Sequence, residues 1–265
     1  MSNIIEIKNL VKKFDDFTAV DNVSLSVKEG EIFVFLGPNG AGKTTTIKIL
    51  TTLLRATSGE ATVNGFDVKK DKNNARRSFG IVFQDQSLDE ELTAYENLEF
   101  HGSLYGLPRK QRRERIEEML NFVELWDRRK DFVKTFSGGM RRRLEIARGL
   151  IHLPKILFLD EPTIGLDPQT RNHIWSYIKN LNKEKGLTVF LTNHYMEEAE
   201  KVADRVAIID KGKIVAQGTP AELIKQTNTD SLEEAFLVLT GKSIREEKAE
   251  TGNHVRMMRN LHTKK

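Results

Sequence analysis

A glycine-rich stretch near the start of the chain, residues 37–45, limits the possible folds more than any other part of the sequence. It satisfies the pattern G-x-x-x-x-G-K-[ST] at every fixed position, with the residues Gly37-Pro38-Asn39-Gly40-Ala41-Gly42-Lys43-Thr44-Thr45. The apolar run 32–36 comes directly before it, and residues 46–50 have the character of a helix opening. A strand, this loop and a helix in that order predict a phosphate-binding loop, a context that a chance glycine turn lacks.

The residue types of this loop indicate how it would bind a nucleoside triphosphate. Glycines allow backbone N–H groups to turn toward phosphate oxygens, and the N-terminus of the following helix adds a partial positive charge. Lys43 is expected to reach the β- and γ-phosphates, and the Thr44 hydroxyl is expected to be a ligand of Mg²⁺.

A second part of the site is predicted where the apolar run 156–159 ends in Asp160-Glu161. A buried parallel strand delivers the residues at its carboxyl end to the crevice in which phosphate-binding loops also lie. Asp160 would then hold Mg²⁺ through water, and Glu161 would orient or deprotonate the water that attacks the γ-phosphate. The alternative for Glu161 is a surface acid at a strand end.

Hydrophobic patterning predicts an α/β fold with two kinds of strand. Residues 5–8 and 23–27 alternate between apolar and polar, as half-buried antiparallel strands do. The runs 32–36, 156–159 and 188–191 do not alternate, which is typical of parallel strands buried on both faces. We therefore expect a P-loop NTPase core with a mainly parallel sheet and an N-terminal antiparallel β layer.

A mostly helical subdomain, about 85–150, is expected to be inserted in this core. Apolar residues recur there at helical spacing, with Pro108 and the charged run 109–115 between the two groups. These residues are Leu92, Tyr95 and Leu98, then Ile116, Met119, Leu120 and Val123. We assign residues 1–241 to one nucleotide-binding domain and residues 242–265, where the apolar pattern stops, to a charged tail that we expect to be flexible.

Charge and composition exclude several classes of protein. The tail 242–265 has seven Lys or Arg and three Asp or Glu, so it accounts for the whole net charge of +4. A body without net charge argues against a nucleic-acid partner. The chain has no cysteine, which excludes disulfides, zinc–thiolate sites and thiol catalysis. We also find no apolar run near the roughly 18 residues that would span a bilayer.

One further motif, Ser137-Gly138-Gly139, narrows the class of ATPase. Between a phosphate-binding loop and an acidic strand, it resembles the signature motif of the ATP-binding-cassette (ABC) ATPases. The similarity covers nearly all of residues 1–241 in the order of that family. By this resemblance Gln84 is the glutamine of the glutamine loop, Gly165-Leu166-Asp167 is the aspartate loop, His194 is the switch histidine, and Phe14 stacks on adenine.

The family resemblance implies a mechanism. Two domains meet head to tail, and each ATP lies between the P-loop of one and the Ser137-Gly138-Gly139 segment of the other. The partner is a second copy, giving a homodimer, or a related ABC ATPase, giving a pseudo-dimer. Mg²⁺ is held by Thr44, Gln84 and Asp160, while Glu161, His194, Gln84 and Lys43 carry hydrolysis. Asp167 joins the nucleotide-binding residues.

Two segments resemble a narrower group within the family. Residues 137–147 and 192–200 are similar to the daunorubicin-resistance type of exporter ATPase, although Phe136 and Met140 replace the usual Leu and Gln of the signature. This resemblance implies an ATPase that powers a separate membrane permease from the cytoplasmic face, exporting drugs, polysaccharides or other hydrophobic or amphipathic compounds. We expect the permease to dock near 85–95, with Leu88, Leu92 and Tyr95 as apolar anchors or, alternatively, as internal packing residues.

Three other functions are alternatives for a chain with a phosphate-binding loop. An uptake-system ATPase differs from the exporter only in its partner. A soluble cassette protein acting on ribosomes or DNA usually has two cassettes or a long coiled-coil insertion, and this chain has neither. A P-loop GTPase would have an Asn-Lys-x-Asp guanine motif, but residues 182–185 read Asn-Lys-Glu-Lys.

Overall fold

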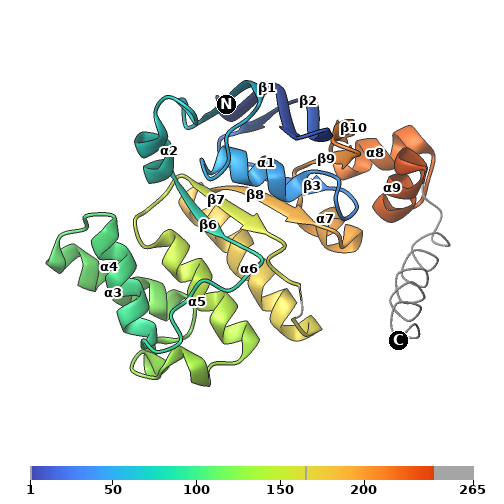
Figure 1. The fold of residues 1–265 in the computed structure, drawn as a ribbon. Helices are drawn as coiled ribbons and strands as arrows, with labels where there is room; N and C mark the ends of the chain where they lie inside the picture. The colour runs from blue at the N-terminus through green and yellow to red at the C-terminus, as the bar shows by residue number, and fades with distance from the viewer. Residues whose placement is uncertain (1, 165, 242–265) are drawn as a thin grey trace, which may run out of the picture.

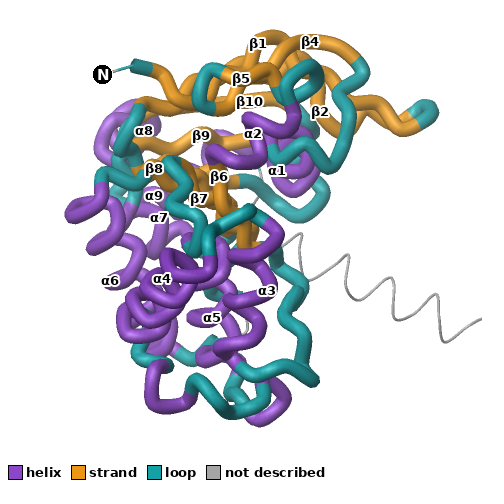
Figure 2. Tube along the Cα trace, turned by 90° about the vertical axis from the view of Figure 1, so that its left-hand side faces the viewer, coloured by secondary structure: helices purple, strands orange, loops and turns teal. Residues whose placement is uncertain are grey.

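The computed structural model describes residues 2–164 and 166–241, so the expected tail 242–265 and Gly165 lie outside the described residues. Within these ranges the chain forms two sheets with helices between and below them. Figure 1 shows the layer containing β1 and β2 at one end, the sheet containing β7 and β8 in the middle, and α3–α5 at the other end. The turned view in Figure 2 shows the same separation, with strands above and helices below.

The first sheet is the expected N-terminal antiparallel layer. Its strand order is β2-β1-β4-β5, and each pair in it is antiparallel. The strands are β1 (Asn3–Phe14), β2 (Phe17–Lys28), β4 (Ser58–Val63) and β5 (Phe66–Asp67).

The second sheet has the order β10-β9-β3-β8-β7-β6 and is parallel except for the hairpin β9–β10. Its strands are β3 (Ile32–Leu36), β6 (Phe79–Val82), β7 (Ile156–Asp160), β8 (Thr188–Asn193), β9 (Arg205–Asp210) and β10 (Lys213–Gly218). Every residue of β3, β7 and β8 is buried, which explains why their sequences do not alternate. The predicted mainly parallel core is therefore confirmed.

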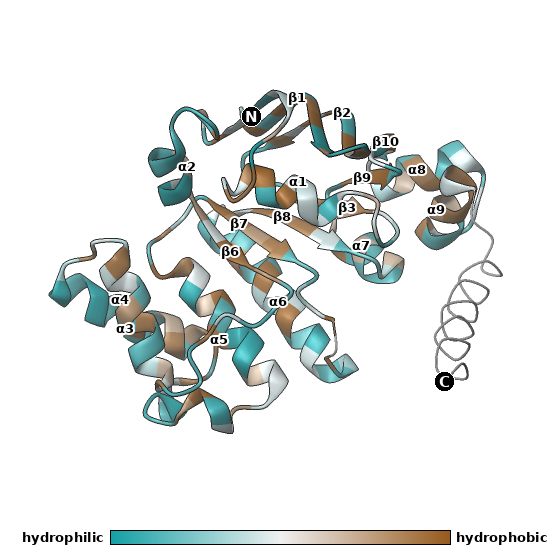
Figure 3. Ribbon diagram, viewed as in Figure 1, coloured by the Kyte–Doolittle hydropathy of each residue, from teal (hydrophilic) through white to brown (hydrophobic). Residues whose placement is uncertain are grey.

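Successive residues of these central strands supply two hydrophobic clusters, one on each face of the sheet. Phe33 and Phe35 pack with β1, β2 and α1 (Lys43–Leu50), while Val34 and Leu36 pack with the helices of the opposite face. Those helices include α6 (Pro168–Lys185), which ends at Gly186 in the left-handed conformation, with a φ of 63°. The hydropathy colouring in Figure 3 shows apolar residues concentrated on β6 and β7.

The expected helical insertion lies between β6 and β7. It contains α3 (Ala94–Leu104), α4 (Arg109–Phe122) and α5 (Gly138–Leu150), with two short 3-10 helices, Trp126–Arg128 and Val133–Thr135. The charged run 109–115 is the first half of α4, not a connection between helices. Leu88 and Tyr95 are partly buried against the main core cluster.

The remaining helices complete the core and the C-terminal end of the described chain. They are α2 (Lys72–Ser78), α7 (Met196–Val202), α8 (Pro220–Thr227) and α9 (Leu232–Thr240). Helix α8 begins with a capping box, because Thr219 and Glu222 each accept a hydrogen bond from the other's backbone N–H.

Candidate nucleotide-binding site

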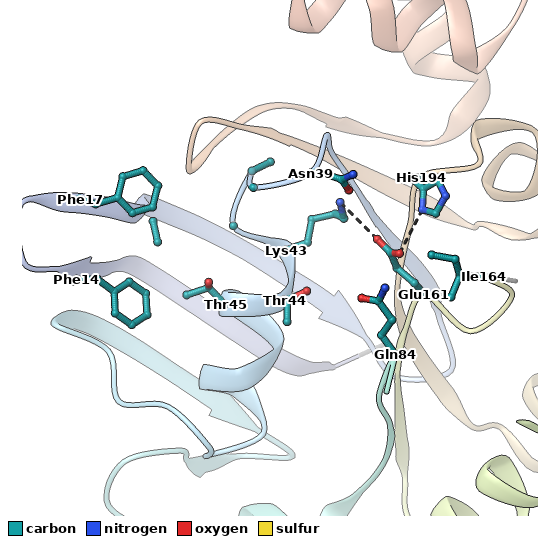
Figure 4. Close-up of a pocket in the computed structure, with 14 residues that line it drawn as sticks. Phe14, Phe17, Asn39, Lys43, Thr44, Thr45, Gln84, Glu161, Ile164 and His194 are labelled. Carbon is teal, nitrogen blue, oxygen red and sulfur yellow. Dashed lines mark ion pairs between the residues drawn. The ribbon is translucent and has the colours of Figure 1, made fainter. Parts of the chain in front are cut away.

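A cavity of about 570 Å³ opens at the carboxyl end of β3 and β7, where a doubly wound sheet is expected to bind its ligand. The P-loop residues 39–45 form one wall, and side chains from four separate parts of the chain complete it (Figure 4). These are Phe14, Phe17, Ala19, Gln84, Glu161, Ile164 and His194. The cavity thus brings together most of the residues that the sequence predicts for ATP and the catalytic step.

The P-loop begins α1 in a way that requires glycine. Gly42 is the residue before the helix and has a φ of 107°, which a residue with a side chain adopts only with strain. A Cβ atom at this position would also lie 2.5 Å from the backbone oxygen of Ala19. The glycine therefore permits close packing on β2 while the first amides of α1 face the cavity.

The side chain of Lys43 folds back onto the backbone of the P-loop. Its Nζ donates hydrogen bonds to the backbone oxygens of Gly37 at 2.7 Å and Pro38 at 3.2 Å, and lies 3.8 Å from Oε1 of Glu161. Burial lowers the pKa of the Lys43 ammonium, although the carboxylates of Glu161 and Asp160 act in the opposite direction. A charged ammonium with so little water around it is well suited to accept a phosphate as partner.

Asp160, the last residue of β7, lies buried next to Thr44 of the P-loop. Its Oδ1 accepts hydrogen bonds from the Thr192 hydroxyl at 2.6 Å and from the Thr44 hydroxyl at 3.4 Å. Burial raises the pKa of this carboxyl group, against the effect of both hydroxyls. Together with the amide of Gln84, Thr44 and Asp160 offer the oxygen donors that Mg²⁺ prefers, so the residues fit this ion.

Glu161 lies between Lys43 and His194, as the dashed lines in Figure 4 show. Its Oε2 is 3.3 Å from Nδ1 of His194, a residue contributed by the segment after β8. The backbone of Glu161 is in the left-handed region, with a φ of 51°. Such strain in a non-glycine residue costs on the order of 1–3 kcal/mol and is concentrated at functional sites. The backbone N–H of Glu161 donates to the Thr192 hydroxyl at 3.1 Å, which holds this conformation.

Two aromatic residues lie at the open end of the cavity, of which the sequence predicts Phe14. Phe17 faces it across the β1–β2 hairpin, and the two rings are 44% and 62% exposed. Directly paired residues of an antiparallel ribbon lie on the same face, so both rings border the cavity. The ammonium of Lys12 is 4.7 Å from the Phe14 ring centre. Phe17 was missed, although its aromatic side chain close after Phe14 was a visible signal.

Four predicted nucleotide-binding residues lie elsewhere. Ser137 begins α5, where its hydroxyl accepts a hydrogen bond from the Met140 N–H at 3.3 Å, and Gly138 and Gly139 form the first turn. Ser137 and Gly139 border a separate cavity of about 180 Å³. Asp167 begins α6 and accepts hydrogen bonds from the backbone and the hydroxyl of Thr170. The first cavity is thus formed without these four residues.

Thr192 is a further residue of the candidate site, and the sequence motifs did not predict it. It is paired with Asp160 in the parallel register of β7 and β8 and binds both Asp160 and the backbone of Glu161. A polar residue in a buried strand is a weak signal by itself, and only the strand register shows its partner.

Among the described residues, 2–164 and 166–241, no helix is both long enough and apolar enough to span a membrane.

Comparison with known proteins agrees with this site. Residues 20–164 match the family described as "ABC transporter". The chain is 45% identical over 243 residues to the linearmycin resistance ATP-binding protein LnrL of Bacillus subtilis, covering 89% of this chain and 78% of that protein. It is 47% identical over 219 residues to the daunorubicin/doxorubicin resistance ATP-binding protein DrrA of Streptomyces peucetius, covering 83% of this chain and 66% of that protein.

Solved structures show the same fold. An ATP-binding subunit of an ABC transporter superposes with a TM-score of 0.81 at 30% identity, covering 89% of this chain and 99% of that one. The dimeric post-hydrolysis state of the ATP-binding cassette MJ0796, bound to ADP and Pi, gives 0.72 at 32% identity, covering 81% and 98%. The chain therefore belongs to the ABC transporter family and is an ATP-hydrolysing subunit of that family.

Proposed function

We propose that this chain is the ATPase subunit of a drug exporter and that it acts as a dimer on a separate membrane permease. The observation that carries the catalytic part is the grouping of Lys43, Glu161 and His194 around one cavity bordered by the P-loop. The relatives named for resistance to linearmycin and daunorubicin support a hydrophobic or amphipathic export substrate.

In the proposed reaction, ATP binds with its triphosphate on the P-loop and its base at Phe14 and Phe17. Lys43 leaves the carbonyl oxygens of Gly37 and Pro38 and binds the β- and γ-phosphates. A water oxygen attacks the γ-phosphorus, the bond to the β–γ bridging oxygen breaks, and Glu161 accepts the water proton. His194, beside Glu161, orients the carboxylate and contacts the γ-phosphate.

Mg²⁺ would be held by Thr44, Asp160 and Gln84. When bound, it neutralises charge that develops on the phosphate oxygens. Asp160 acts through the ion, and Thr192 keeps the carboxylate aimed at it through the 2.6 Å hydrogen bond.

The distance of the signature from the P-loop supports a dimeric site. Ser137 and Gly139 border their own cavity, and Asp167 is engaged with Thr170, so one copy has the two halves of the family's nucleotide site on different surfaces. Two copies in opposite orientation would join the P-loop of each with the Ser137-Gly138-Gly139 segment of the other. The neighbouring structure of a cassette dimer with ADP and Pi supports this arrangement.

For the permease we propose the outer face of α3. Phe100 and Leu104 lie one helical turn apart there and are 62% and 67% exposed. We propose these two residues as the apolar anchors instead of Leu88, Leu92 and Tyr95. The permease places the chain at the cytoplasmic face of the membrane as a peripheral subunit.

The export function can be tested in the host cell. Deleting the gene should increase susceptibility to at least one amphipathic drug, and the wild-type gene should restore resistance. A Lys43→Ala gene should not restore it, because the P-loop can no longer bind the γ-phosphate. If the deletion instead impairs nutrient uptake and leaves drug susceptibility unchanged, the chain serves an importer.

A further inference from the structure

Helix α5, which begins with the signature segment Ser137-Gly138-Gly139 and is called the signature helix below, contains a buried ion pair. This pair contacts the segments that contain Gln84 and Glu161. Arg142 and Glu145 are one turn apart on α5, with Nη1 of the arginine 2.9 Å from Oε2 of the glutamate. Their side chains are only 7% and 1% exposed. Removing two charges from water is costly, so a pair in this position needs further hydrogen bonds to be maintained.

Arg142 makes those hydrogen bonds with the main chain of the catalytic segments. Its Nη1 donates to the backbone oxygen of Phe83 at 2.6 Å, and its Nη2 lies 3.5 Å from that of Gln84. The same Nη2 lies 3.4 Å from the backbone oxygen of Glu161. One guanidinium thus bridges the segment after β6, which contains Gln84, to the segment after β7, which contains the proposed base.

Glu145 binds the segment after β6 through its other carboxylate oxygen. Its Oε1 accepts a hydrogen bond from the backbone N–H of Ser87 at 2.9 Å. Arg148, one turn further along α5, donates to the backbone oxygen and the hydroxyl of Ser87 at 2.5 Å each. Helix α5 therefore holds both ends of the segment from Phe83 to Ser87.

The backbone of Glu161 needs support of this kind. Its φ of 51° is strained, and the Thr192 hydroxyl accepts its N–H while Arg142 donates to its carbonyl. Peptide groups on both sides of the Glu161 Cα are therefore held, one by β8 and one by α5. A shift of α5 would act on Glu161 and Gln84 together.

We propose that Arg142, kept in place by Glu145, is a positioning residue for hydrolysis. It fixes the main chain of Glu161 and Gln84 to the helix that begins with Ser137-Gly138-Gly139, so that engagement of this segment aligns the base with the attacking water. This inference rests on the role proposed for Glu161. Through Arg142, a movement of the signature helix would change the position of Glu161 in the same copy.

The test is the double variant Arg142→Gln/Glu145→Gln, which removes both charges of the ion pair together. A misplacement of about 1 Å at a reacting group can cost about 10²-fold, so we expect kcat to fall by about that factor. The KM for ATP should stay near the wild-type value, because the P-loop and Lys43 are unchanged. Arg142→Lys, which keeps the charge but cannot bridge three carbonyl oxygens, should be intermediate.

The chain provides a matched control. Arg115 and Glu118 form another Arg–Glu pair one turn apart, and Arg115 is also buried, but its guanidinium donates to the backbone oxygens of Leu150 and Ile151. Arg115→Gln/Glu118→Gln should lower the midpoint of thermal unfolding without lowering kcat. An equal loss of kcat in this control would show that any weakened helix contact slows hydrolysis, and would overturn the proposal.

A second readout separates positioning from a general loss of structure. In a Glu161→Gln background the Arg142→Gln/Glu145→Gln change should cause little further loss, because the base that it positions is absent. The proposal would be overturned if the combined variant lost kcat by the product of the two separate fold-losses. It would also be overturned if Arg142→Gln/Glu145→Gln alone kept the wild-type kcat. Wild-type turnover in Glu161→Gln alone would instead refute the role of Glu161, so the two failures are distinguishable.

Discussion

Three ionisable side chains, those of Lys43, Asp160 and Glu161, lie buried beside the P-loop, and each is at most 9% exposed. Burial raises the pKa of Asp160 and lowers that of Lys43, so in both cases the charged form is disfavoured by the fold. A raised carboxyl pKa means that Asp160 contributes most to stability when protonated. This contribution is lost as the pH rises through the folded-state pKa.

Asp160→Asn should therefore stabilise the nucleotide-free protein at neutral pH while removing a proposed ligand of Mg²⁺. The amide oxygen of asparagine can still accept hydrogen bonds from Thr192 and Thr44, so the local geometry is retained. We expect a higher midpoint of thermal unfolding at pH 7 and loss of ATP hydrolysis. The difference in midpoint should shrink as the pH is lowered, and a lower midpoint at pH 7 would contradict this account of Asp160.

The rings at the cavity mouth lead to a prediction about binding of the base. Phe14→Ala should weaken ATP binding by about 1–3 kcal/mol, the scale of stacking between a base and an aromatic residue. Phe14→Tyr should be nearly neutral because the stacking face is kept. Isothermal titration measures both affinities, and equal affinity of the alanine variant would exclude stacking on Phe14.

At the scale of single residues, sequence motifs predict those side chains whose chemistry has a fixed spacing. The P-loop, Asp160-Glu161 and His194 follow from motif and context. Thr192 and Arg142 do not, because each acts on the backbone or side chain of a residue far away in the sequence. Such contacts depend on strand register and on helix packing, which no local pattern contains.

At the scale of elements, the strands were well predicted and the helical insertion less so. Burial on both faces leaves an unambiguous apolar run in β3, β7 and β8. The first half of α4 lacks such a pattern, because its buried side is covered in part by arginine. Arg112 pairs with Glu99 at 2.8 Å, and buried Arg115 donates to backbone oxygens at the C-terminal end of α5, so charged residues make part of the helix contacts.

The exposed face of α3 gives a prediction about coupling. Phe100→Asp should leave folding and basal ATPase activity unchanged but abolish stimulation of ATPase activity by the permease in reconstituted vesicles. The comparison variant is Leu88→Asp, which introduces a charge where Leu88 packs against the core. Leu88→Asp should lower the unfolding midpoint, whereas full permease stimulation in Phe100→Asp would remove α3 as the docking face.

At the scale of the whole molecule, the two halves of the family's nucleotide site do not meet in one copy. Lys43 and Glu161 border the P-loop cavity, while Ser137 and Gly139 border another. The fold and its family could be predicted from sequence because the order of the motifs is distinctive. The meeting of two copies depends on surface complementarity, for which a single sequence has no equivalent signal.

The central claim is that Glu161 activates water at an ATP site closed by a second copy, and Glu161→Gln tests it most directly. The substitution keeps Asp160 and the whole P-loop, so ATP and Mg²⁺ should still bind. Loss of a general base should lower kcat by about 10²–10⁴-fold. ATP that is bound but not hydrolysed should then hold two copies together.

The measurement combines size-exclusion chromatography and light scattering, with and without MgATP, with an ATPase assay on the same samples. Glu184→Gln, an equivalent change at an exposed position of α6, is the control and should behave as wild type. We predict that Glu161→Gln is a dimer with MgATP, a monomer without nucleotide, and nearly inactive. Wild-type turnover by this variant, or a monomer at saturating MgATP, would contradict the account.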